Sequence, residues 1–181
     1  MSIPTLPLEG TTCRLRRWRR EDAESLARHA DDLGVWRNLR DAFPHPYTLE
    51  DAHGFLGLTV DLEEPHNLAI EVEGQAAGGI GVKRLEDVER VGAEIGYWLG
   101  RAFWGRGVVS EAVALATPFF LAQFELTRVF ALPFARNAPS VRVLEKAGYE
   151  LEGRMRKSAI KEGELQDQLL FAWVPDAGAE E

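Results

Sequence analysis

The chain has 181 residues, 45% of them hydrophobic and 28% charged, which suits a single globular domain over residues 1–181. Its 29 acidic residues outnumber 21 basic ones, and the formal net charge of -8 argues against nucleic acid as the main partner. Cys13 is the one cysteine, so a disulfide framework is excluded. The start of the chain lacks a signal-peptide pattern, and no apolar run has membrane-spanning length, so we expect a cytoplasmic protein without membrane contact.

The first third of the chain predicts one strand followed by helices. Residues 1–10 are expected to be irregular, and the alternation of 13–18 indicates a strand. An acidic start and a basic end predict a helix over 21–30, and a second short helix is expected over 35–39. Two prolines make 41–47 a loop, after which Thr48 is expected to cap a helix that runs to about Leu62.

The remainder of the chain alternates strands with two helices. Strands are expected over 67–73, 76–85, 91–99, 128–134, 149–157 and 166–174. The apolar run 108–124 predicts the main helix, which Pro118 should kink or split, and a helix over 137–147 ends at Gly148. The tail after Pro175 is expected to fray. The order β-α-α-β-β-β-α-β-α-β-β predicts an α+β fold on one mixed sheet.

The junction between the strand 91–99 and the helix 108–124 carries two glycines, Gly105 and Gly107. Without a Cβ they let a ligand approach the main chain, and the positive end of the following helix faces the same point. An anion such as a pyrophosphate can bind such a place, although a tight turn before a helix has the same pattern. A Walker-type loop is absent from the sequence, and Ser110 stands where the dinucleotide fingerprint requires a third glycine.

Three stretches, 43–52, 94–112 and 137–149, together resemble the GNAT family of N-acetyltransferases, and within it the RimJ- and RimL-like enzymes that acetylate ribosomal-protein N-termini. The resemblance extends from Arg14 to Trp173. It implies a three-layer α/β arrangement in which a mixed, mostly antiparallel sheet has helices on both faces and a splayed strand pair that binds acetyl-CoA. One departure is Trp104, where the family commonly has glutamine or arginine; main-chain amides make that contact, so we do not expect binding to be lost.

The resemblance also implies which residues contact acetyl-CoA, as cosubstrate, and the acceptor. Main-chain amides of the glycine loop would hold the pyrophosphate, and the splayed strand would pair with the pantetheine arm. The predicted cofactor contacts are Tyr97, Trp98, Leu99, Trp104, Gly105, Arg106, Gly107, Val108, Val109, Ser110, Asn137, Ser140 and Lys146. The predicted acceptor contacts are Trp36, Asn38, Arg40, Phe43 and His45. Simple core packing is the alternative for Trp36 and Phe43, and a plain loop position for His45. The four histidines lack metal-ligand spacing, so no metal is expected.

Acetyl transfer requires a neutral amine, and Glu94 is the candidate base, at a position where related enzymes carry a glutamate. The alternative is an ion-paired or solvated glutamate on a sheet face. Many family members have a tyrosine seven residues after the asparagine of the third stretch, but here that residue is Leu144. The subgroup instead offers Ser140 as the acid, with a first-turn serine bonded to the backbone as the alternative. Cys13 is expected to be buried, which favours direct attack by the amine.

The predicted activity is therefore acetyl transfer from acetyl-CoA to a primary amine, with a protein N-terminal α-amine as the favoured acceptor. A small-molecule amine acetyltransferase, acting on a polyamine, an amino sugar or an amino-acid-like compound, is the alternative enzyme. A non-catalytic acyl-CoA-binding module is the alternative from another class. Many relatives form homodimers, so the resemblance allows a homodimer, but the sequence does not decide it.

Overall fold

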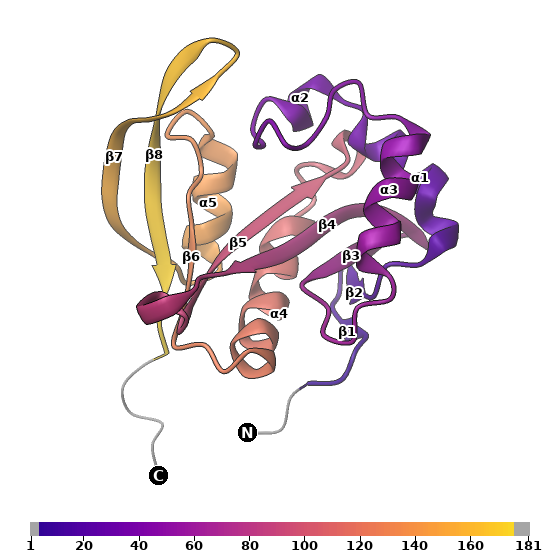
Figure 1. Ribbon diagram of the computed structural model, residues 1–181, viewed down its shortest axis with the longest axis horizontal. Helices are drawn as coiled ribbons and strands as arrows, with labels where there is room; N and C mark the ends of the chain where they lie inside the picture. The colour runs from indigo at the N-terminus through magenta and orange to yellow at the C-terminus, as the bar shows by residue number, and fades with distance from the viewer. Residues whose placement is uncertain (1–3, 176–181) are drawn as a thin grey trace.

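The computed structural model describes residues 4–175, and the predicted fraying after Pro175 lies outside them. Eight strands form one sheet in the order β1-β2-β3-β4-β5-β6-β8-β7 (Figure 1). The strands are β1 Leu8–Glu9, β2 Arg14–Arg16, β3 Asn67–Val72, β4 Gln75–Arg84, β5 Gly92–Leu99, β6 Arg128–Ala131, β7 Glu150–Lys161 and β8 Glu164–Trp173. Only β5 and β6 run parallel among these neighbouring pairs. The predicted mixed, mostly antiparallel sheet is confirmed.

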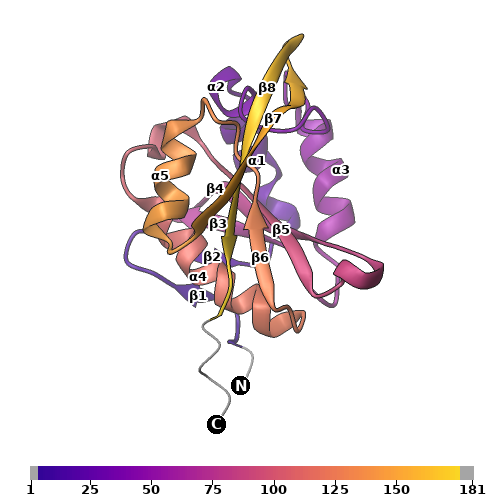
Figure 2. The same cartoon turned by 90° about the vertical axis from the view of Figure 1, so that its left-hand side faces the viewer.

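Helices cover both faces of the sheet, which gives three layers. The helices are α1 Ala23–Ala30, α2 Leu33–Trp36, α3 Leu49–Thr59, α4 Val108–Gln123 and α5 Ala138–Lys146. Figure 2 shows α4 and α5 on one side of the sheet and α3 on the other. The larger core lies between the sheet and α4, where Phe119 and Phe120 are fully buried. A second core joins α1 and α3 to the opposite face through residues such as Trp18 and Leu56.

The first third of the chain differs from the prediction at several element boundaries. Leu8–Glu9 forms β1, paired with β2, although this stretch was expected to be irregular. Helix α2 begins at Leu33, two residues early, because the Asp32 carboxylate caps it by accepting hydrogen bonds from the amides of Gly34 (2.7 Å) and Val35 (3.2 Å). Thr48 caps α3 as predicted.

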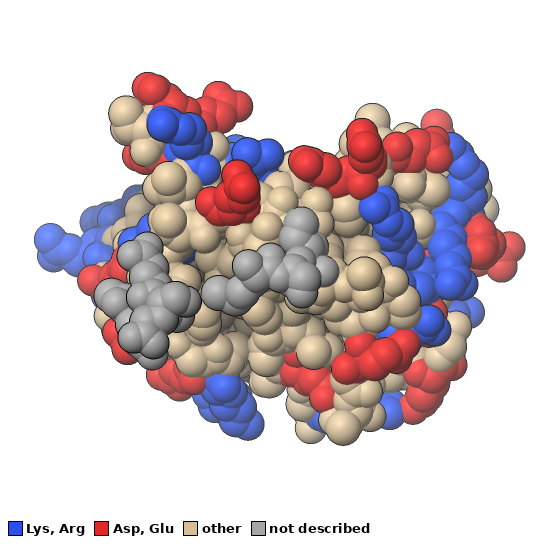
Figure 3. Space-filling view, turned by 90° about the horizontal axis from the view of Figure 1, so that it is seen from below, with Lys and Arg blue, Asp and Glu red and all other residues tan. Residues whose placement is uncertain are grey.

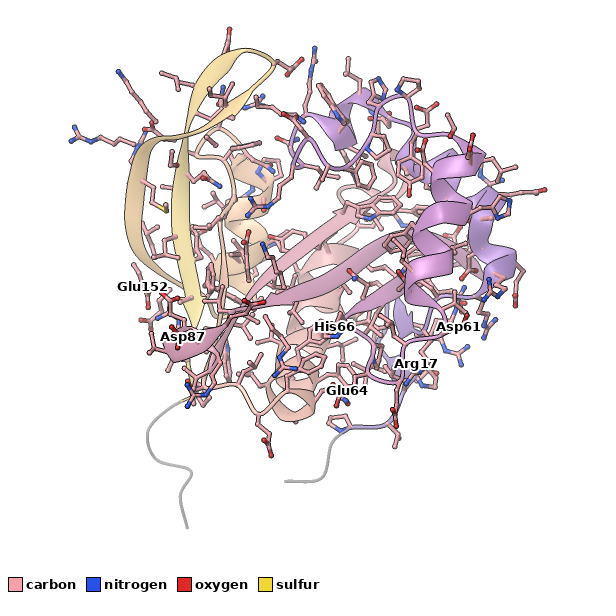
Figure 4. All side chains as sticks on the ribbon, in the orientation of Figure 1. Arg17, Asp61, Glu64, His66, Asp87 and Glu152 are labelled. Carbon is pink, nitrogen blue, oxygen red and sulfur yellow. The ribbon has the colours of Figure 1, made fainter. Side chains whose placement is uncertain are left out.

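Helix α3 ends at Thr59 rather than near Leu62, and carbonyl groups beyond its end bond to a side chain from a distant part of the chain. The Arg17 guanidinium donates hydrogen bonds to the carbonyl oxygens of Leu62 (2.7 Å) and Glu63 (2.8 Å). Figure 4 shows Arg17 and Asp61 close together at this end of the helix. The chain is thereby turned from α3 towards β3.

Helix α4 continues through Pro118, so of the predicted kink or split the split is wrong and the kink stays a prediction. Proline removes the hydrogen bond that would end on the carbonyl of Ala114. Both Pro118 and Ala114 are exposed. The carbonyl oxygen therefore faces water, which can supply the missing hydrogen bond without breaking the helix.

The hairpin of β7 and β8 is longer than predicted, and its tip leans towards α2 (Figure 1). Only Glu162 and Gly163 separate the two strands, both with positive φ (53° and 79°), as a tight hairpin turn requires. The Lys161 ammonium lies 2.7 Å from an oxygen of Asp41. This lysine is almost completely buried although it is charged. The hairpin tip is therefore fastened to the segment that follows α2.

On the face seen in Figure 3, basic and acidic side chains are mixed. Exposed ion pairs on the described surface include Arg20–Asp61 (2.5 Å) and Arg128–Glu152 (2.8 Å). None of the helices within residues 4–175 is both long enough and apolar enough to cross a membrane. The absence of a nucleic-acid partner stays a prediction.

Candidate active site

A cavity of about 1250 Å³ lies where the two helical layers meet the parted strands of the sheet. Its wall draws on β4, β5, the start of α4, α5 and the segment between α2 and α3. Residues from all three stretches that carry the family resemblance therefore meet in one place.

Strands β5 and β6 separate at Glu94. Their parallel pairing comprises Gly92 with Arg128, Ala93 with Val129 and Glu94 with Phe130, and in the described chain it stops there. From Ile95 to Leu99, one edge of β5 is left facing the cavity, so its main-chain groups can pair with an extended ligand that carries amides. The predicted splay beside Tyr97, Trp98 and Leu99 is present.

The glycine loop after β5 presents main-chain N–H groups to the cavity. Gly105 and Gly107 have φ of 75° and 79°, in the left-handed region that favours glycine. A Cβ on either would meet no described atom within 4 Å, so the space in front of the loop is open. Gly107 is the N-cap of α4, and among residues 4–175 no side chain caps it. The first-turn amides of Val108, Val109 and Ser110 have no intrahelical acceptors and can bind an anion.

The side chains of Trp104 and Arg106 support the loop rather than the anion site. The Trp104 indole donates a hydrogen bond to the carbonyl oxygen of Leu99 (2.7 Å), which ties the loop to the end of β5. The Arg106 guanidinium pairs with Glu73 (2.5 Å), in the turn between β3 and β4. Unlike its neighbours Gly105 and Gly107, Arg106 does not belong to the cavity wall that the described residues form.

Glu111 fixes the first turn of α4, a role that the sequence reasoning missed. Its carboxylate accepts hydrogen bonds from the amides of Thr11 (2.7 Å), Thr12 (2.6 Å) and Cys13 (3.1 Å), and from both threonine hydroxyl groups. Burial acts to raise the pKa of Glu111, but the threonine hydrogen bonds outweigh it and lower the pKa to about 2. Burial, reinforced by the Glu111 charge, raises the pKa of the Cys13 thiol to about 12. Cys13 is thus an inert buried residue, as expected.

Ser140 meets a hydroxyl partner that the sequence did not predict. Asn137 caps α5 by accepting a hydrogen bond from the Ser140 amide (3.3 Å). The Ser140 Oγ lies 2.8 Å from the hydroxyl oxygen of Tyr97, and both residues line the cavity. Burial raises the pKa of Tyr97 to about 12, although the hydrogen bond to Ser140 opposes the rise. Both hydroxyl groups are therefore protonated at neutral pH. Leu144, which replaces the family tyrosine, is buried in the core.

Glu94 lines the cavity and is also ion-paired, as the alternative reading expected, while its role as a base stays a prediction. The Arg40 guanidinium donates a hydrogen bond to its carboxylate. The Glu94 side chain is 21% exposed, whereas that of Arg40 is 68% exposed. The carboxylate therefore lies on the sheet, while its partner reaches it from an exposed residue outside the helices and strands.

Three of the five predicted acceptor contacts line the cavity, and two do not. Asn38, Arg40 and Phe43 line the cavity, but Trp36 and His45 do not belong to the wall that the described residues form. Trp36 instead packs under the Lys161 ammonium, 3.6 Å from the ring centroid, and stacks on His45 at 5.6 Å. They lie outside the cavity because the hairpin tip covers the Trp36 ring.

Several lining residues were not predicted, and two of them had a signal in the sequence. Arg142 lies one helical turn before Lys146, so both fall on the same face of α5. Gly96 follows Glu94 by two residues and shares its face of β5. Within residues 4–175, no group of histidine, cysteine or acidic side chains is arranged to hold a metal ion. His66, for example, stacks on Phe124 at the end of α4 (Figure 4).

Comparisons with known proteins agree with this geometry. The family model described as acetyltransferase (GNAT) domain matches residues 13–150. An uncharacterized N-acetyltransferase, p20, from Bacillus licheniformis is 28% identical over 164 residues, covering 87% of this chain and 90% of that protein. The ribosomal-protein-serine acetyltransferase of Escherichia coli is 29% identical over 105 residues, 58% of each chain.

The fold is also that of solved acetyltransferases. RimL, a ribosomal-protein α-N-acetyltransferase solved in complex with coenzyme A, superposes with a TM-score of 0.81 at 20% identity, covering 97% of this chain and 98% of its own. At this identity the likeness shows the fold alone. The family model, however, covers most of the chain from Cys13 into β7. The chain therefore belongs to the GNAT family and is an N-acetyltransferase.

Proposed function

We propose that the protein transfers the acetyl group of acetyl-CoA directly to the α-amine of a protein or peptide N-terminus. The observation that carries this proposal is the parting of β5 from β6 at Glu94, in the same cavity as the uncapped start of α4. One end of the cavity suits a pyrophosphate, and an open strand edge leads from it to a carboxylate. The Escherichia coli relative, named for a ribosomal protein, supports the choice of acceptor.

The residues present fit coenzyme A. Amides of the loop from Gly105 to Ser110 would bind the pyrophosphate, where the absence of Cβ atoms leaves open space. The edge of β5 from Ile95 to Leu99 would pair with the pantetheine amides. Asn137, Ser140 and Lys146 would line the other side, and Arg142 adds a second positive charge on α5. Coenzyme A supplies the thioester whose carbonyl carbon is attacked.

In a direct attack, one residue acts on the protons of the acceptor amine and another acts on the departing sulfur. Glu94 would take a proton from the incoming ammonium as Arg40 moves aside, and the freed nitrogen would form a bond to the carbonyl carbon. The carbon–sulfur bond then breaks, and the nitrogen gives its second excess proton to solvent as the amide forms. The Ser140 hydroxyl would hydrogen-bond the departing thiolate, or give it a proton and regain one from solvent. An α-amine, with a pKa of about 8, is neutral far more often at pH 7 than a lysine of about 10.4, which favours N-termini.

A panel of acceptors tests the proposal. The protein and acetyl-CoA would be incubated with a lysine-containing peptide, with the same peptide blocked at its N-terminus, with spermidine and with glucosamine. Thiol release and the mass of the product would be followed. We expect turnover only with the free N-terminus. Faster acetylation of the blocked peptide or of spermidine would contradict the proposal. Cytoplasmic location and a homodimer stay predictions, the latter open to light scattering.

A further inference from the structure

The floor on the acceptor side of the cavity is open at Gly96, whereas the Asn67 side chain covers the neighbouring Gly81. Antiparallel pairing places Gly81 opposite Gly96 and Lys83 opposite Glu94. Since side chains alternate along a strand, Glu94, Gly96 and Trp98 share one face of β5, and Trp98 packs against the core beneath α1 and α3. A Cβ built on Gly96 meets no atom of the described chain within 4 Å. Space for a ligand therefore exists directly above Gly96.

Beyond this floor stands a surface that we call the aromatic wall, defined by the half-buried rings of Phe43, Phe55 and Trp98. The Phe43 ring centroid lies 5.6 Å from that of Trp98 and 4.9 Å from that of Tyr47, which is buried and also lines the cavity. Trp98 follows Gly96 by two residues, so the wall begins about 7 Å along the strand from the floor. A side chain extending from a group above Gly96 would reach it.

Acidic side chains are scarce around this space. Within the described residues, the cavity wall holds two carboxylates, Glu94 and Asp51, and each is already engaged. Arg40 pairs with Glu94, and Thr48 donates hydrogen bonds to Asp51 from its amide (2.8 Å) and hydroxyl (2.6 Å). The basic lining residues are Arg40, Lys83, Arg142 and Lys146. A polyamine or amino sugar with several positive charges would meet repulsion here.

We propose that the aromatic wall binds the side chain of the residue that bears the reacting amine, and that this side chain is large and apolar. The inference rests on the proposed function, because it places the amine above Gly96, next to Glu94. The side chain then extends along β5 to Phe43 and Trp98 and leaves water, which favours binding. Leucine, methionine or phenylalanine would occupy the wall, whereas serine or alanine would leave it uncovered.

Peptides that differ only in their first residue test the inference. Four peptides would begin with serine, alanine, leucine or phenylalanine, and kcat/KM would be measured from thiol release. One methylene in an apolar pocket discriminates by about 10–200-fold, so leucine and phenylalanine should exceed alanine and serine by about 10-fold or more. Equal rates, or a preference for serine or alanine, would overturn the inference and leave acetylation of N-termini standing.

Failure of every peptide would instead count against the proposed function, and calorimetry then decides the inference without turnover. Protein in millimolar coenzyme A would be titrated with phenylalaninamide and with alaninamide. Binding of phenylalaninamide about 10-fold tighter supports the aromatic wall. Equal affinity, or no measurable binding of either amide, overturns it.

Two variants and a control locate the preference within the cavity. Gly96→Val fills the open space above the floor, and Phe43→Ala removes one ring of the wall, so each should bring the phenylalanine-to-alanine ratio of kcat/KM close to one. Gly54→Val is the control, since a Cβ there also meets no described atom within 4 Å but the residue lies on α3 outside the cavity wall. A ratio unchanged in both cavity variants would contradict the inference.

Discussion

The hydroxyl groups of Tyr97 and Ser140 lie 2.8 Å apart where β5 faces the first turn of α5. Tyr97 comes from the strand that parts from β6, and Ser140 from the helix across the cavity. A hydrogen bond thus spans the two sides of the site. Since burial raises the pKa of Tyr97 to about 12, the tyrosine stays protonated and can donate to Ser140 while Ser140 donates to a leaving sulfur.

Removal of the two hydroxyl groups should separate their roles. Ser140→Ala should lower kcat by about 100-fold, the lower range for a lost proton donor. Tyr97→Phe removes only the partner of Ser140 and should cost about 10-fold, the effect of one hydrogen bond. Stopped-flow thiol detection measures both rates, and the Kd for coenzyme A should change little. Wild-type turnover in Ser140→Ala would confine the pair to a structural role.

Removing the charge of Glu94 should impair acetyl transfer, whereas removing the charge of its partner Arg40 should improve binding of the acceptor. Glu94→Gln should lower kcat by about 100-fold or more, because the amine loses its proton acceptor. Arg40→Gln should lower the KM for the acceptor, because the guanidinium no longer competes with the ammonium for the carboxylate. Steady-state kinetics with a saturating cofactor measures both.

The thermal unfolding midpoints of the two variants provide the control. The Arg40 side chain is 68% exposed, so the ion pair should contribute less than about 1 kcal/mol to stability. If Arg40→Gln destroys activity, the arginine is part of the catalytic arrangement and the competition described here is wrong.

The glycine loop permits a matched test of the anion site. Gly107→Ala forces a Cβ onto a residue with φ of 79°, which costs about 1–2 kcal/mol and so disturbs the loop that presents the first-turn amides of α4. Gly163→Ala carries the same strain, since its φ is also 79°, but lies in the hairpin turn between β7 and β8. Calorimetry should show coenzyme A binding weakened by about 10-fold or more in Gly107→Ala alone. Equal affinities in the two variants would move the pyrophosphate away from this loop.

Glu111 should make stability depend on pH in the acid range. Its pKa is about 2 in the folded chain against about 4.3 in an unfolded one, so its contribution is complete above pH 4.5 and is lost as the pH falls towards 2. Glu111→Gln should be less stable than the wild type at pH 7, and the difference should shrink between pH 4.5 and 2. Urea unfolding followed by fluorescence measures the free energy at each pH.

Glu145→Gln supplies the control, because this carboxylate is exposed on α5. The substitution should leave the acid dependence of stability unchanged. A constant difference between wild type and Glu111→Gln from pH 7 to pH 2 would show that the hydrogen bonds from Thr11 and Thr12 do not depend on the charge.

Sequence periodicity and turn residues predicted the sheet and its main helices, because these depend on local patterns. The start of α2 was predicted too late, since it depends on the Asp32 cap. The end of α3 was also predicted too late, and the carbonyl groups beyond it bond to the distant Arg17, a contact that no local pattern predicts. The glycine loop was predicted because Gly105 and Gly107 suit a backbone conformation with positive φ, which glycine adopts readily. Helix α4 showed the limit of a local rule, because the effect of Pro118 depends on which side of the helix meets water.

Site residues that lie on one strand or one helix were predicted. The contacts between residues from distant segments were missed. Glu94 and Ser140 line the cavity as expected, but their partners Arg40 and Tyr97 come from other elements, and no spacing rule connects them. Trp36 was misplaced for the same reason. The buried Lys161, about 125 residues later, covers its ring and removes it from the cavity.

The hydrogen bonds that Glu111 accepts from Thr11 and Thr12 join the beginning of the chain to the helix that follows the glycine loop, almost a hundred residues later in the sequence. A shortened protein that starts at Arg14 would keep every residue that faces the cavity, yet the first turn of α4 would lose its anchor. Trimming the N-terminus should therefore weaken cofactor binding before it unfolds the domain, and a tag or fusion placed close to Thr11 should do the same.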